Sequence, residues 1–73
     1  MIERFLKYSL ENGRKISVIL SDSQGMKRKN LQVTAVEEEG FYALFPGRKK
    51  AVKVPFSSVL TADYARGDHG ELE

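Results

Sequence analysis

The chain contains no cysteine and only one histidine among its 73 residues. Disulfide bridges and thiolate chemistry are therefore excluded, and a zinc site with ordinary nitrogen and sulfur ligands is not expected. The purely apolar runs, such as Val18-Ile19-Leu20, are only a few residues long, far shorter than the roughly 20 residues that span a membrane. No basic segment followed by an apolar stretch indicates a signal peptide. We expect a cytoplasmic protein with no cofactor and no membrane contact.

What the chain does contain is typical of one small globular domain. Twelve basic and ten acidic residues give a net charge of +2, and 41% of the residues are hydrophobic. A domain of this size buries a core that barely offsets its chain entropy, so we expect a compact, cross-braced topology or self-association. Leu72-Glu73 matches the dipeptide commonly left before a purification tag, so it is omitted from the fold prediction.

The N-terminal segment has the apolar spacing of a helix. Its apolar residues fall near one face: Ile2, Phe5, Leu6 and Leu10. Glu3 and Lys7 stand four residues apart in the favourable order for an ion pair. Asn12-Gly13 ends the pattern, because glycine readily closes a helix in the left-handed conformation. The sequence therefore predicts a helix over residues 2–12.

Beyond Gly13 the period of the apolar residues changes from helical to alternating. This pattern predicts five short strands, at residues 15–22, 26–36, 41–45, 49–54 and 59–64. Asp22-Ser23-Gln24-Gly25 has the composition of a hairpin turn, and Pro46-Gly47 that of a type II turn. Ala35-Val36 breaks the alternation, which indicates a bulge or a sharp bend. Pro55 interrupts the ladder because it has no N–H to donate.

Several strands are apolar on parts of both faces, as Phe41 and Ala43 against Tyr42 and Leu44 illustrate. A flat sheet with one solvent-exposed face does not favour apolar residues on both faces, whereas a strongly bent sheet does. We predict an α+β fold, mainly antiparallel β, in which an N-terminal helix caps an SH3-like (Sm-like) small barrel of five strands. The alternative is an open antiparallel sheet with the helix lying across it. The domain covers residues 1–64, and residues 65–73 form a tail.

The same alternation predicts which residues form the core. We predict burial of Phe5, Leu6, Ile16, Val18, Leu20, Leu31, Val33, Phe41, Ala43, Val52, Val54, Val59 and Leu60.

Four segments resemble the WYL-domain family. Residues 10–19, LENGRKISVI, resemble its opening helix, basic turn and first strand, and residues 22–25 resemble its first hairpin. Gly40-Phe41-Tyr42-Ala43 stands where the family has Trp-Tyr-Leu, with Phe41 in place of Trp. Residues 53–60 stand where the family has its final motif, without its arginines. The resemblance implies an Sm-like barrel that senses ligands, often nucleic acid, within bacterial transcription regulators. Sm proteins themselves share the order of one helix and five strands.

Basic residues gather in two clusters. Lys27-Arg28-Lys29 opens the second strand, and Arg48-Lys49-Lys50, with Lys53, opens the fourth. Both follow hairpin turns, so they could converge at one end of a barrel. Several cations with an aromatic ring nearby suit a nucleic-acid backbone and its bases. The predicted nucleic-acid-binding residues are Lys27, Arg28, Lys29, Tyr42, Arg48, Lys49, Lys50 and Lys53.

We therefore expect a non-enzymatic module that binds single-stranded nucleic acid or a nucleotide ligand in a bacterial regulatory setting. The alternative is a protein-interaction or dimerisation module, whose edge-strand lysines serve only solubility.

Other polar residues indicate no chemistry. Glu37-Glu38-Glu39 fits a solvated turn, because no convergent oxygens from other segments suggest a metal site. Ser57-Ser58 lacks an evident base, and His69 lies in the predicted tail without a partner to orient it. The glycines are spaced as turn residues rather than as a phosphate-binding loop. We therefore expect no catalytic residues and no metal ligands.

Overall fold

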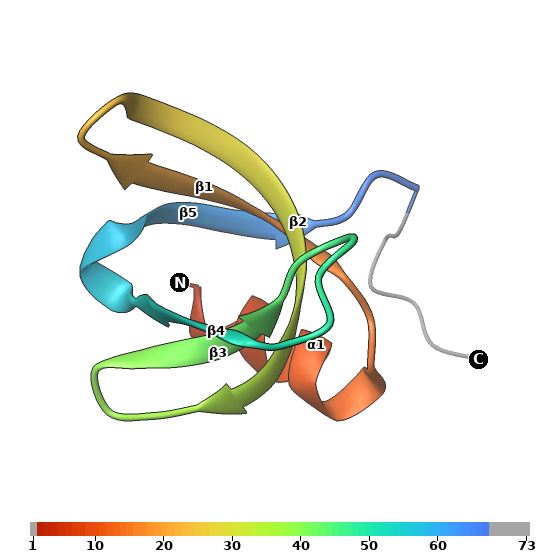
Figure 1. The fold of residues 1–73 in the computed structure, drawn as a ribbon. Helices are drawn as coiled ribbons and strands as arrows, with labels where there is room; N and C mark the ends of the chain where they lie inside the picture. Colours follow the sequence, from red (N-terminus) through yellow and green to blue (C-terminus); the bar gives the residue numbers. More distant parts are fainter. Residues whose placement is uncertain (1, 68–73) are drawn as a thin grey trace.

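The computed structural model describes residues 2–67 and has the predicted order of one helix and then five strands (Figure 1). Its elements are α1 (Glu3–Asn12), β1 (Ile16–Asp22), β2 (Gly25–Val36), β3 (Gly40–Leu44), β4 (Val52–Pro55), the 3-10 helix η1 (Phe56–Ser58) and β5 (Val59–Tyr64). Of the predicted tail, residues 65–67 are described, and His69 and Leu72-Glu73 lie outside the described residues. The fourth strand begins later than predicted, at Val52 instead of residue 49.

One antiparallel sheet contains all five strands in the order β4-β3-β2-β1-β5. Strand β2 pairs with β1 as far as Leu31 and with β3 from Gln32 onward, so it passes through both halves of the sheet. Figure 1 shows it curving across the molecule. The predicted α+β class is confirmed, and the sheet is barrel-like but not closed, with β4 and β5 at its edges.

Two irregularities accompany the bend. The β2–β3 register shifts between Val33 and Ala35, next to the predicted break at Ala35-Val36. The β1–β5 register shifts between Ile19 and Leu20. An extra residue in one strand of an antiparallel pair increases the local twist and bends that strand. The sheet therefore curls around its inner face and forms a small core.

That core draws on the helix and all five strands. The buried hydrophobic residues are Leu6, Ile16, Val18, Leu31, Val33, Phe41, Ala43, Val54 and Ala62. All except Ala62 were predicted, and Phe5, Leu20 and Val59 pack against them while partly exposed.

The predicted burial of Val52 and Leu60 is wrong, since these residues are 45% and 50% exposed. Both lie in edge strands. Val52 is the first residue of β4, and only β3 flanks it. Leu60 falls in the β1–β5 irregularity: Leu20 pairs with Val59 and Ile19 with Thr61, so Leu60 has no partner across the ladder.

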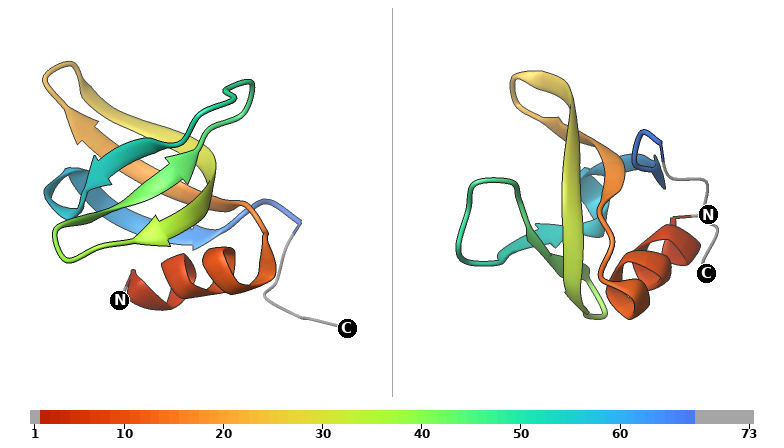
Figure 2. Two further views of the ribbon diagram at one scale, coloured as in Figure 1. Left: turned by 60° about the horizontal axis from the view of Figure 1, so that its bottom comes forward. Right: turned by 90° about the vertical axis from the view of Figure 1, so that its right-hand side faces the viewer.

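Helix α1 packs beneath the sheet and is joined to it by a buried serine (Figure 2, left). Ser9 is fully buried; its hydroxyl donates to the Arg14 carbonyl at 2.6 Å and accepts from the Val33 N–H at 2.8 Å. Strand β1 begins opposite Leu31, so beyond that residue the helix replaces β1 beside β2. Leu10 lies away from this contact and is 41% exposed.

Aromatic rings of α1 also pack against a ring at the end of β5. The rings of Phe5 and Tyr8 meet the ring of Tyr64 edge-on, with centroids 4.9 and 5.1 Å apart. Edge-to-face pairs of this kind stabilise beyond the area they bury. They attach α1 to the end of β5, so the helix contacts both halves of the bent sheet.

Two glycines are required by local geometry. Gly47 has φ 79°, and the Arg48 N–H donates to the Phe45 carbonyl at 3.0 Å, which confirms the type II turn predicted at Pro46-Gly47. Gly40 faces the backbone of β4, where a Cβ atom would overlap the Val54 carbonyl oxygen and lie 2.9 Å from the Pro55 Cα. Strand β3 can therefore begin this close to β4 only because Gly40 has no side chain.

Replacing Ser9 by alanine should lower the free energy of unfolding by about 1–3 kcal/mol, because the Val33 N–H would remain buried without an acceptor. Chemical denaturation of Ser9→Ala measures this loss. Ser57→Ala removes an exposed hydroxyl from η1 and should change stability by no more than about 0.5 kcal/mol. Equal stability of the two variants would contradict a structural role for the Ser9 hydroxyl.

Gly40→Ala should also destabilise the fold, by roughly 1–3 kcal/mol, because the added methyl group forces β3 and β4 apart. Thermal unfolding of Gly40→Ala, beside Glu39→Ala in the turn that precedes β3, tests the close approach. A melting temperature for Gly40→Ala as high as that of the control would show that the two backbones are not in contact there.

Candidate nucleic-acid interface

Strand β2 separates the first predicted cluster between its two faces. Lys27, Arg28 and Lys29 are all exposed and pair in regular register with β1. Successive residues of a strand point to opposite faces, so Lys27 and Lys29 share the face of buried Leu31, whereas Arg28 lies on the outer face. The three cations therefore do not act as one patch.

Arg28 instead lies near a basic residue from the far end of the chain. A hollow of about 480 Å³ is lined by Ser17, Arg28, Asn30, Tyr64 and Arg66. The register explains this grouping, because Ser17 of β1 pairs with Asn30 on one side and with Asp63 of β5 on the other. Arg28 and Arg66 both reach this hollow from exposed positions.

The second cluster also gains a partner that is distant in sequence. Arg48 lines a smaller hollow of about 170 Å³ with Lys15, Gln32, Leu44 and the turn Phe45-Pro46-Gly47. Lys15 immediately precedes Ile16, which pairs with Leu31, so Lys15 stands beside Gln32. The type II turn thus lines the same hollow as Lys15 and Gln32.

The two hollows flank one face of β2. Arg28, Asn30 and Gln32 alternate along this outer face and span about 13 Å at the usual rise of a strand. We name this surface the β2 basic face and define it as Lys15, Arg28, Asn30, Gln32, Arg48 and Arg66. Figure 2 (right) shows the elements that contribute to it, with the β3–β4 loop, β2, the start of β1 and the segment after β5 following one another from left to right.

Tyr42 lies on the same outer side of the sheet. It is half-buried, stands two residues from Leu44 along β3, and pairs across the ladder with Lys53. The Lys53 Nζ lies 3.4 Å from Glu37 Oε1, so this predicted phosphate ligand already has an anionic partner. Tyr42 is thus an aromatic ring beside the β2 basic face, while the charge of Lys53 is partly compensated.

Lys49 and Lys50 lie in the exposed loop between β3 and β4. Both views of Figure 2 show this loop and the β1–β2 hairpin projecting from separate parts of the sheet. The two sequence clusters therefore do not merge into one surface. Each supplies one arginine, Arg28 or Arg48, to the β2 basic face.

Lys15, Asn30, Gln32 and Arg66 are not among the residues that the sequence predicts for this surface. Their signal is present only in the strand register: Ile16 pairs with both Leu31 and Tyr64, which brings the residues just before β1 and just after β5 next to the middle of β2. Once the β2-β1-β5 order and this register are known, counting outward from the Ile16 pairs locates Lys15 and Arg66.

Other candidate chemistry has little structural support in residues 2–67. No group of three histidine, cysteine, aspartate or glutamate residues is placed there to hold a metal ion. Glu37, Glu38 and Glu39 are exposed, as expected for a solvated turn. Within the same residues, no helix has the length and apolar character needed to cross a membrane.

Comparison with known proteins gives no relative: no family model, curated protein or solved structure matches the chain. The WYL-like and Sm-like resemblance therefore stays a prediction.

Proposed function

We propose that the chain is a non-enzymatic cytoplasmic module that binds single-stranded nucleic acid on the β2 basic face. The observation that carries this proposal is the pair of hollows on either side of β2, each lined by cations from segments far apart in the sequence. A bacterial regulatory setting follows from the WYL-like resemblance alone.

The chemistry of the face suits a phosphate backbone. Arg28 and Arg66 flank one hollow, and Lys15 and Arg48 flank the other. Arginine presents a fork of N–H donors that matches phosphate oxygens, and several such cations release counterions when a nucleic acid binds. The amides of Asn30 and Gln32 between them offer both donors and acceptors, as base edges and sugar hydroxyls require.

An aromatic ring at the edge of such a face favours unpaired bases. Tyr42 lies on the same side of the sheet as Gln32 and Leu44, and it is partly exposed. Bases of a single strand stack on rings of this kind with little dependence on sequence. We therefore favour a single strand over a duplex, whose bases are already stacked.

The first test compares two double variants that change the charge on opposite faces of β2. Arg28→Glu with Arg66→Glu should weaken binding of short labelled oligo(dT) and oligo(U) by about a hundredfold, since each of the two lost arginine–phosphate contacts is worth ~1.5 kcal/mol or more. Fluorescence anisotropy at two salt concentrations measures the affinity and its salt slope. The slope of the parent protein should exceed that of the variant by about 0.7 per phosphate released.

Lys27→Glu with Lys29→Glu is the matched control, because it makes the same change in net charge on the opposite face of β2. Its affinity should fall much less than that of the arginine variant. Equal losses of affinity in the arginine and lysine variants would indicate that the oligonucleotide is attracted by net charge alone. Absence of binding by the parent protein at low salt would reject the proposal.

A second test seeks a gain in affinity. Asp63 pairs with Ser17, so the register places this acidic residue beside the Arg28–Arg66 hollow. The Asp63 carboxylate accepts a hydrogen bond from the Tyr64 N–H at 2.7 Å. Asp63→Asn removes an anion that repels phosphate, so oligonucleotide affinity should rise about two- to fivefold at low salt, the range for one exposed charge interaction. The same anisotropy titration detects it, and Glu38→Gln, in the acidic turn, should have a smaller effect.

A further inference from the structure

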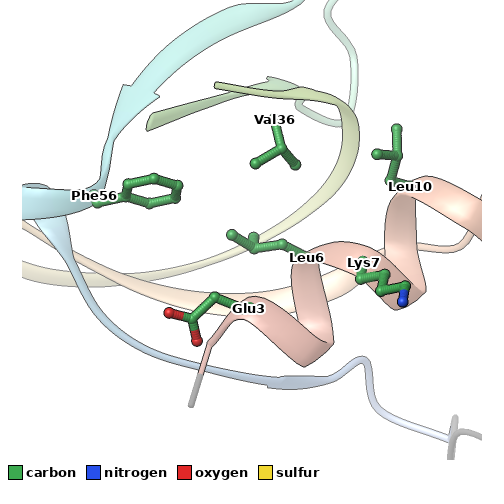
Figure 3. Close-up of a pocket in the computed structure, with 6 residues that line it drawn as sticks. All are labelled: Glu3, Leu6, Lys7, Leu10, Val36 and Phe56. Atoms are coloured by element: carbon green, nitrogen blue, oxygen red, sulfur yellow. The ribbon is translucent and has the colours of Figure 1, made fainter. Parts of the chain in front are cut away.

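An apolar groove lies between helix α1 and the far end of β2, on a part of the molecule that the nucleic-acid proposal does not use. It encloses about 300 Å³ and is lined by Glu3, Leu6, Lys7, Leu10, Val36 and Phe56 (Figure 3). Leu10 and Val36 are 41% and 46% exposed. Exposed apolar side chains thus lie beside two charged ones in a single groove.

The arrangement along the groove is self-complementary. Figure 3 shows Phe56 and Glu3 at one end, Leu6 and Val36 in the middle, and Lys7 and Leu10 at the other end. A two-fold axis through the middle would place Leu10 of each copy against Phe56 of the other. The same operation brings Glu3 of each copy opposite Lys7 of the other. An interface of this symmetry uses one patch on both partners, which requires that the patch match its own rotated image.

The charges on the rim are free for such a contact. Glu3 and Lys7 have the spacing of an ion pair within one helix, yet no ion pair joins them or connects either of them to another residue in the range 2–67. Each would find an oppositely charged partner across the two-fold axis. Opposite charges at the rim of an apolar contact fix its register and select the partner.

From this match we propose that the groove is a homodimer interface, in which α1 helices of two copies pack antiparallel and cover Leu10, Val36 and Phe56. Burial of these side chains supplies the driving force, and the crossed Glu3–Lys7 pairs set the orientation. The partner is a second copy of this chain. The proposal is independent of nucleic-acid binding.

The test uses exchange of charge between copies. Glu3→Lys and Lys7→Glu should each weaken self-association about tenfold or more, because each places like charges on both sides of the axis. An equimolar mixture of the two variants should associate as tightly as the parent protein, since a mixed dimer contains two opposite-charge pairs. Sedimentation equilibrium of each protein alone and of the mixture gives the dissociation constants.

Two further variants locate the contact. Leu10→Lys replaces an exposed leucine and should abolish the dimer while leaving the circular dichroism spectrum unchanged. Lys50→Glu makes the same charge change as Lys7→Glu in the β3–β4 loop, outside the groove, and should leave the dissociation constant unchanged.

Each outcome decides the proposal. Recovery in the mixture, with loss in each single variant, supports the antiparallel groove dimer. A parent protein that stays monomeric up to about 1 mM, the limit of weak association, overturns it and leaves the groove to a different protein. Dimers that withstand both charge variants and Leu10→Lys also overturn it, because self-association would then use another surface, such as the edge of β4 or β5.

Discussion

The hydroxyl of Ser9 is the contact on which the arrangement of the molecule depends. It bridges the carbonyl that follows the helix and the N–H of Val33, just past the point where β1 ceases to accompany β2. A strand that loses a neighbour in the interior of a protein must have its polar groups satisfied by another element. The helix supplies this at one position, and β2 can then continue into the second half of the sheet. This contact fixes α1 against β2 next to the β2–β3 register shift that bends the sheet.

The continuity of β2 also determines how the surface is organised. Its outer face, from Arg28 to Gln32, receives cations from the residues before β1, after β5 and beyond the Pro46-Gly47 turn. Its far end contributes Val36 to the groove along α1. Two chemically different surfaces, one basic and polar and one apolar, are thus built on a single strand. A domain of this size can present both surfaces because β2 is long enough to pair with β1 in one half of the sheet and with β3 in the other.

Much of this fold was predictable, and the failures have identifiable causes. The period of two along β1 and β2, the turn at Pro46-Gly47 and the break at Ala35-Val36 are local signals, and the structure agrees with them. Val52 and Leu60 were misassigned because alternation shows which residues share a face but not how far an edge strand is covered. A lone polar residue on an apolar helix face, such as Ser9, could have indicated a buried hydrogen bond. Arg66 required a cross-strand register, which no single segment contains.

The open edge of the sheet has a consequence for the behaviour of the chain at high concentration. Strand β4 is four residues long, and its exposed residues include Lys53 and Pro55. Short length, lysine and proline are the devices by which natural sheets discourage further strands from adding to an edge. A proline in an edge strand leaves a position without a donor for an incoming chain. Head-to-tail growth into filaments needs an adhesive surface at both ends of each copy. The composition of β4 therefore protects this small, open sheet against fibrillar aggregation.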